Sequence, residues 1–208
     1  GNGITAIGFF ACANTTADNS MGIGASALTA NTSGGDNIAI GNNALDANTT
    51  GSSMTAMGYN ALGQMVDGYA NSAFGHESLR YATSGNNLTA FGNKALEQVT
   101  TSSNHTAVGS GAARYVTTAT NITCVGYNTG HAKQTGDSLT AVGNSCLRQA
   151  TGNNNTAMGN NAGYSITSGT NNTIMGHYAQ MLNNVTDNTM IGHGAGYNTS
   201  GNQNTGIG

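Results

Sequence analysis

A four-residue motif, Thr-Ala-apolar-Gly, recurs along the whole chain of 208 residues. Neighbouring copies lie 16 or 17 residues apart, so the phase of the repeat never drifts. A period this short and regular indicates one supersecondary unit stacked on itself, in which each unit buries its apolar side chains against its neighbours. The motif ends on thirteen glycines, which we call the anchoring glycines: Gly8, Gly24, Gly41, Gly58, Gly75, Gly92, Gly109, Gly126, Gly143, Gly159, Gly176, Gly192 and Gly208.

The composition leaves disorder as the alternative to a stacked fold. Only 6% of the residues are charged, while glycine supplies 32 residues and proline is absent. Polar chains of low complexity often fail to bury enough apolar surface to fold. Here an apolar residue returns at a fixed place in every repeat, for which a disordered tract has no reason, so we expect an ordered structure.

We number positions from the anchoring glycine, G, so that G−1 precedes it and G+1 follows it. Position G−1 is apolar in every repeat, G−2 is mostly alanine and G−3 is usually threonine, as in Thr55, Ala56 and Met57. Because alternate residues of a strand face opposite sides, threonine and the apolar residue share one face and alanine occupies the other. We expect the G−1 residues to form the core of each coil, and the alanine face to lie outside.

The rest of each repeat predicts how the coil closes. Alanine and leucine at G+3 and G+4, as in Ala44 and Leu45, predict a second short apolar strand. This segment is followed by threonine, then commonly by glycine, and then by Asn, Asp or Ser, which are residues typical of turns. Helix is disfavoured, since each interior glycine costs about 1 kcal/mol there. The sequence therefore predicts an all-β fold: a parallel β-solenoid, or β-roll, of about thirteen coils of 16–17 residues in a single array over residues 1–208. We also expect ladders of hydrogen bonds along the Thr and Asn columns.

Such a coil holds few apolar residues, so its core is thin. A flat face of alanine lets another chain approach closely. We therefore expect the chain to self-associate through its alanine faces.

The repeat resembles two families of fibrous proteins. Asn87-Leu88-Thr89-Ala90-Phe91-Gly92 is similar to the head repeat of trimeric autotransporter adhesins, Asn-Ser-Val-Ala-Ile-Gly. The longer unit at 38–51 resembles the 17-residue arrays of phage tail-fibre proteins even more closely. The resemblance covers the whole chain and implies a homotrimeric, left-handed parallel β-roll built for surface display or host attachment. It carries no catalytic residue.

Signatures of enzymes are weak. The glycines of residues 22–27 fit a degenerate dinucleotide pattern, but the repeat generates it and no helix can follow. No Gly-x-Ser-x-Gly or Cys-x-x-Cys motif is present. We expect no enzyme activity, no catalytic residue and no cofactor. The cysteines Cys12, Cys124 and Cys146 fall in small or apolar columns, which favours free thiols packed as small hydrophobes over disulfides.

Charge and hydropathy restrict the partners. The formal net charge is −3, without a basic stripe of the kind that follows a phosphate backbone, so we expect no nucleic-acid partner. No apolar run approaches membrane-spanning length, and no signal peptide opens the chain. Gly1 already lies inside a repeat and no initiator Met is present, so we expect a segment of a longer protein.

The variable positions G+1 and G+2 are the candidate contact surface. Exposed aromatic rings beside amides suit a host glycan or protein, although a spacer surface that binds nothing is the favoured alternative. His177 and His193 would stack on neighbouring coils and could seat a metal, but a varied surface ladder is the simpler interpretation, so no metal ligand is assigned. The candidate contacts are Phe9, Tyr59, His76, Tyr127, His177, Tyr178 and His193.

Ten Asn-x-Ser/Thr sequons occur, but a repeat rich in Asn and Thr produces them without selection, so glycosylation is not expected. The sequence thus predicts a structural and attachment module: the shaft or receptor-binding region of a phage tail fibre, on the virion surface. The head of a cell-surface adhesin is the alternative. An ice-binding solenoid is less favoured, because the regular threonine would share a strand face with the core residue.

Overall fold

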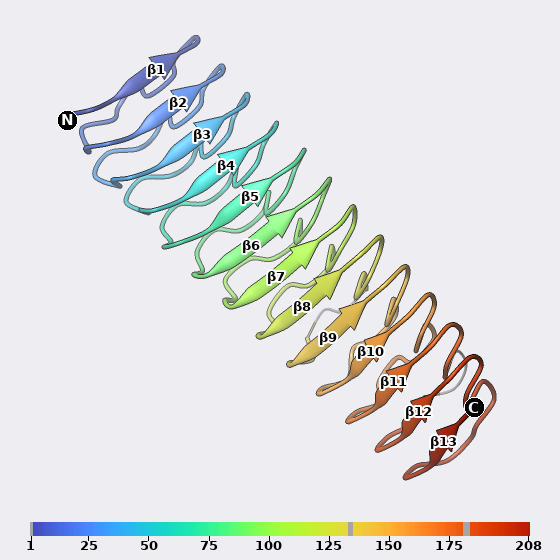
Figure 1. Ribbon diagram of the computed structural model, residues 1–208. Coiled ribbons are helices and arrows are strands. Elements are labelled where there is room, and N and C mark those ends of the chain that lie inside the picture. The colour runs from blue at the N-terminus through green and yellow to red at the C-terminus, as the bar shows by residue number, and fades with distance from the viewer. Residues whose placement is uncertain (1, 133–134, 181–183) are drawn as a thin grey trace. The chain divides into compact units, whose positions relative to one another are not determined.

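A computed structural model describes residues 2–132, 135–180 and 184–208. It divides the chain into two compact units, residues 1–105 and 106–208. Each unit is a stack of coils with one short strand per repeat (Figure 1). The strands of the first unit are β1 (Thr5–Ile7), β2 (Met21–Ile23), β3 (Ile38–Ile40), β4 (Thr55–Met57), β5 (Ser72–Phe74) and β6 (Leu88–Phe91). The second unit has β7 (His105–Val108, of which His105 belongs to the first unit), β8 (Ile122–Val125), β9 (Leu139–Val142), β10 (Thr156–Met158), β11 (Thr173–Met175), β12 (Thr189–Ile191) and β13 (Thr205–Ile207).

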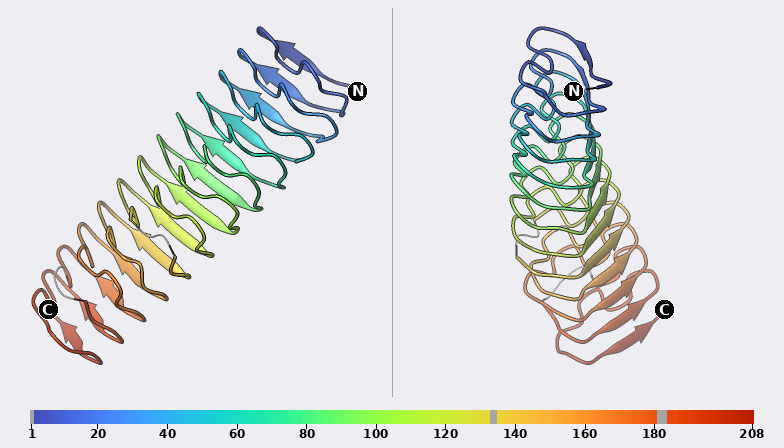
Figure 2. Two further views of the ribbon diagram at one scale, coloured as in Figure 1. Left: turned by 180° about the vertical axis from the view of Figure 1, so that it is seen from behind. Right: turned by 90° about the vertical axis from the view of Figure 1, so that its left-hand side faces the viewer.

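Within each unit, consecutive strands pair in parallel and keep like residues in register. Between β3 and β4, for example, Ala39 pairs with Ala56 and Ile40 pairs with Met57. Figure 2 shows the strands of a unit gathered on one side of the coils, with loops completing each turn. The predicted fold class, an all-β parallel solenoid, is therefore confirmed.

The core uses the opposite strand face from the one that the sequence analysis expected. Ala39, Ala56, Ala73 and Ala90, at position G−2, are fully buried. The G−1 residues lie outside, where Met57 and Phe91 are 41% and 56% exposed. The prediction of a G−1 core and an exposed alanine face was wrong, because the leucine found at G+4 in most repeats of the first unit fills the interior and leaves room for only a small strand residue beside it.

Side-chain sizes inside the coil show how narrow it is. Leucines at G+4, such as Leu45 and Leu62, are fully buried within each coil, which also buries the small G−2 residue. Where G−2 is larger, as at Met190, position G+4 is Gly196, on which an added Cβ would lie 2.5 Å from the sulfur of Met190. Gly130 likewise leaves room for Cys124. This exchange of volume explains why glycine replaces leucine at G+4 in these two repeats.

The second strand expected in each coil is also absent from the described residues, which form turns after each anchoring glycine from Gly8 to Gly192. The leucine at G+4 adopts a left-handed backbone, with φ of 50° at Leu45 and 52° at Leu62. An extended strand cannot contain such residues. Backbone bonds instead link neighbouring coils, as from Leu45 N–H to the carbonyl oxygen of Ala61 at 3.1 Å.

The expected polar ladders are present. Thr32 and Thr49 each donate a side-chain hydrogen bond to the next coil, to the carbonyl oxygens of Thr49 and Val66 at 2.9 and 3.1 Å. Buried asparagines at G−4 of the second unit form a second ladder, in which Asn172 Nδ2 donates to Asn155 Oδ1 at 2.9 Å. These ladders satisfy polar groups that the coil buries.

The three cysteines are free and buried, as predicted. Burial raises the pKa of the Cys146 thiol to about 12. At pH 8 only about one such thiol in ten thousand is ionised, against roughly a quarter for a free cysteine. We expect iodoacetamide at pH 8 to leave Cys146 unmodified in the folded protein and to modify it in guanidinium chloride, as read by peptide mass spectrometry. Equal labelling rates in both states would contradict the burial of this thiol.

Candidate functional site

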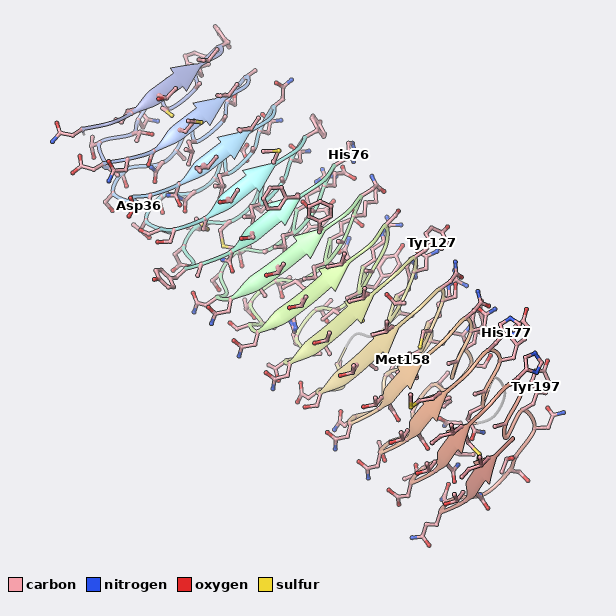
Figure 3. All side chains as sticks on the ribbon, viewed as in Figure 1. Asp36, His76, Tyr127, Met158, His177 and Tyr197 are labelled. Atoms are coloured by element: carbon pink, nitrogen blue, oxygen red, sulfur yellow. The ribbon has the colours of Figure 1, made fainter. Side chains whose placement is uncertain are left out.

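The most regular surface of each unit is the outer face of its strands, formed by positions G−3 and G−1 and called here the strand face. In the first unit, Thr89 and Phe91 are exposed on it, and the rings of Phe74 and Phe91 stack with centroids 5.5 Å apart. In the second unit, Met158 is 48% exposed and lies on the outer side of β10 (Figure 3). The strand face therefore presents a column that is threonine throughout the second unit and is shared with Met21, Ile38 and Ser72 in the first, beside a column of apolar side chains.

This face carries no charge. Over all thirteen repeats, neither G−3 nor G−1 holds an acidic, basic or histidine residue. Monomeric proteins rarely expose contiguous apolar patches of this kind, which usually mark sites of association. An uncharged face also meets no like-charge repulsion when it packs against an identical copy of itself.

The predicted contact residues of the first unit lie in the loops after the strands. Phe9 is 73% exposed and packs on Phe10, with ring centroids 4.2 Å apart. Tyr59 and His76 stack in neighbouring coils at 5.3 Å. Asn93 continues this stack, with its Nδ2 at 3.4 Å from His76 Nδ1. Tyr59 and His76 thus come together as a short exposed ladder, while Phe9 pairs with its own neighbour.

The remaining predicted contacts belong to the second unit. Tyr127 is 55% exposed. His177 packs against Tyr178 at 4.0 Å and His193 at 5.2 Å, and Figure 3 shows His177 beyond the carboxyl ends of the strands. Within the part of the chain that the structure describes, no group of three or more His, Cys, Asp or Glu side chains is placed to hold a metal ion.

A polar groove lies on another corner of the first unit, before the strands. It has a volume of about 480 Å³ and a lining of glycine, serine, threonine, Asp67, Tyr69 and Asn86. Tyr69 is 58% exposed, and its N–H donates to Asn86 Oδ1 at 2.9 Å, which fixes the amide at the rim. The groove offers one aromatic ring, one carboxylate and several hydroxyls to a ligand.

A cluster of charges occupies the loops after β5 and β6. Glu77 is buried and pairs with Arg80 and with Lys94, whose Nζ lies 3.1 Å from Glu77 Oε2. Burial alone would raise the pKa of Glu77, but the Lys94 hydrogen bond and the charges of Arg80, Lys94 and His76 outweigh it and hold the pKa below its usual value. Lys94 also lies 3.5 Å from Glu97. The cations of the first unit are thus matched by acids.

Two surface features were not predicted from the sequence. The groove was overlooked because its residues are ordinary turn residues, although Tyr69 is the one aromatic residue at position G−6. A run of basic residues at position G+5 was also overlooked. Aligning the repeats on their anchoring glycines would have shown it, since Arg114, His131 and Arg148 follow one another in this column.

No helix among the described residues has the length and apolar character needed to cross a membrane. Comparison of the chain with protein-family models, with curated proteins and with solved structures finds no match.

Proposed function

We propose that this chain is a structural and attachment module that works as a homotrimer, with the strand face of each chain packed against two further copies. The observation that carries the proposal is the exposed, uncharged strand face. It supplies apolar area that a thin coil cannot bury by itself, and it replaces the alanine face as the surface of association.

The resemblance of the repeat to tail-fibre arrays supports the shaft or receptor-binding region of a phage tail fibre, on the virion surface. The head of an extracellular, cell-surface adhesin is the alternative biology for the same assembly. The complete gene separates them, because a C-terminal chaperone domain is typical of the fibre, whereas a coiled-coil stalk with a membrane anchor is typical of the adhesin.

Light scattering of the folded chain tests the assembly. We expect a molar mass three times the 20.8 kDa of one chain. Met57→Lys together with Met158→Lys should reduce it to the mass of a single chain, because assembly would bury both charges in apolar surroundings.

Val66→Lys is the matched control for these substitutions. Val66 is 44% exposed, close to the 41% of Met57, but it lies outside the strand face. It should leave the trimer intact. A wild-type mass of one chain, or a trimer that survives both strand-face lysines, would overturn the proposal.

The same face supports a second function. Ice binding was disfavoured because threonine was expected beside the core residue, but Thr123, Thr140 and Thr156 are exposed. Their column repeats at the strand spacing of about 4.8 Å. A trimer would bury this column, so the test is a measurement of thermal hysteresis on a single-chain form. Thermal hysteresis would favour ice binding, and a lack of thermal hysteresis would exclude it.

A further inference from the structure

The polar groove of the first unit is built from three neighbouring positions of four consecutive repeats, G−8, G−7 and G−6. Its floor at G−7 is glycine backbone. A Cβ added to Gly68 would lie 2.8 Å from the sulfur of Met65 and 2.9 Å from Nδ2 of Asn71, both of which are fully buried, so position G−7 faces into the coil. The side chains on either side form the two rims: Thr50, Asp67, Ser84 and Thr101 at G−8, and Ser52, Tyr69, Asn86 and Ser103 at G−6.

The side chains at G−6 form a hydrogen-bond ladder that is interrupted in the groove. Ser52 Oγ accepts a hydrogen bond from the N–H of Gly35 in the preceding coil at 3.2 Å. Asn86 Oδ1 accepts one from the N–H of Tyr69 in the same way, at 2.9 Å. The Tyr69 side chain takes no part in this ladder, and the N–H of Ser52 donates instead to the carbonyl oxygen of Gly68 at 3.0 Å. The repeat thus gives up a ladder contact at the coil that carries an exposed aromatic ring.

Two departures from the repeat meet in this one coil. Tyr69 is the one aromatic residue at G−6, and Asp67 is the one charged residue at G−8. They stand on opposite rims, with Gly68 between them, and both are exposed. Packing of the coil requires neither side chain, because the neighbouring coils carry serine, threonine or asparagine at these positions. A ligand held between the rims would account for both.

The chemistry of the lining restricts the ligand. None of the lining residues is positively charged, and the Asp67 carboxylate repels an anion while it accepts hydrogen bonds from hydroxyl groups. The volume of about 480 Å³ is typical of small-molecule sites, which range over about 300–1,000 Å³. Four coils at the strand spacing extend the groove over about 14 Å, which suits an elongated ligand.

We propose that the groove binds a neutral oligosaccharide, whose hydroxyl groups donate to Asp67 and accept from Asn86 Nδ2 while one sugar ring packs on Tyr69. The apolar face of a sugar packs on an aromatic ring, and its hydroxyls pair with a carboxylate, an amide and the hydroxyls of the rims. A cationic ligand would also pair with Asp67, but it would leave most of the hydroxyl lining without partners. This inference deepens the proposed attachment function and rests on it.

A glycan array tests the inference with neutral oligomers of glucose, galactose, mannose, N-acetylglucosamine and rhamnose, together with sialylated and sulfated oligosaccharides. We expect the chain to bind neutral glycans and not the acidic ones. Calorimetric titration with the neutral glycan that binds best then measures the variants. Tyr69→Ser and Asp67→Thr should each weaken binding about tenfold, since the first removes the aromatic face and the second removes a charge-assisted hydrogen bond. Tyr69→Phe keeps the ring and should retain most of the affinity.

The two test substitutions introduce residues that the repeat already carries at these positions, as at Ser103 and Thr101, so the coils should stay folded. Circular dichroism of each variant checks this. Asp36→Asn is the matched control, because Asp36 is also an exposed carboxylate before the strands of the first unit but lies outside the groove lining. It removes the same charge as Asp67→Thr and should leave the affinity unchanged.

Several results would overturn the inference. These are an array on which no neutral glycan binds, unchanged affinity in folded Tyr69→Ser, or tighter binding of spermidine or pentalysine than of any neutral glycan. The molar mass of the same samples separates this test from the proposed function. A trimer that does not bind overturns only the saccharide site, whereas a single chain that binds retains the site and overturns the assembly.

Discussion

Replacing Gly58 by alanine is expected to destabilise the first unit by at least about 3 kcal/mol, or to prevent its folding. Gly58 has φ of 138°, a conformation that an L-residue with a side chain rarely adopts. An added Cβ would also lie 2.6 Å from the carbonyl carbon of Gly75 in the next coil. Since that atom is backbone, relief requires the coils to separate and their ladder of hydrogen bonds to lengthen.

Gly35→Ala is the matched control in the same unit. Its φ lies outside the left-handed region, and the nearest atom to an added Cβ is the carbonyl oxygen of Asp18 at 3.5 Å. The free energy of unfolding of the Gly35→Ala variant should stay within about 1 kcal/mol of the wild-type value. Guanidinium unfolding followed by far-UV circular dichroism measures both variants. If Gly58→Ala and Gly35→Ala are equally stable, close approach of the coils is not the reason why every anchoring position holds glycine.

The second large effect is expected from Asn172→Ala in the buried asparagine ladder. Asn172 Nδ2 donates to Asn155 Oδ1 and to the carbonyl oxygen of Val185, at 2.9 and 2.8 Å, and its Oδ1 accepts from the N–H of Asn188 at 3.1 Å. Truncation leaves the Val185 carbonyl oxygen and the Asn188 N–H buried without these partners, each at about 1–3 kcal/mol, while Asn155 Oδ1 keeps the backbone N–H of residue 172. We expect the second unit to lose about 3–5 kcal/mol.

Asn144→Ala provides the comparison for the asparagine ladder. Asn144 is exposed in the loop after β9, so its truncation should change the free energy of unfolding by about 0.5 kcal/mol or less. The same guanidinium titration measures both variants. If Asn172→Ala is as stable as Asn144→Ala, the buried amides are not a significant source of stability.

The fold class could be predicted from the sequence because the same pattern of strand residues followed by glycine recurs in every repeat. Thr-Ala-Met at 55–57 alternates as a strand does, and Gly58 ends it with a conformation that few other residues reach. A fixed period also sets the register, since pairing Ala39 with Ala56 aligns every other column.

The candidate contacts were predicted only in part. Aligning the repeats predicted that His177 and His193 stack on neighbouring coils, and the structure brings their rings together. Tyr59 and His76 were predicted only as members of the same column, and they also stack. The groove at Tyr69 could not be predicted in the same way, because a concave corner depends on how the turns before successive strands stack.

The sequence by itself determined the repeat, its strand and its register, but only the tertiary structure decided which strand face lies inside. Periodicity shows that the strand has two faces but not which of them is buried. Hydrophobicity alone predicted that the face with the bulkier residue, Met57 rather than Ala56, lies in the core. The width of the coil reverses that choice. Leucines such as Leu62 already fill the interior, so the strand places a small residue inward beside them, and a larger residue occurs only where leucine is absent, as at Cys124 beside Gly130. Packing volume across the coil therefore turned the apolar column outward, where it is available to other chains.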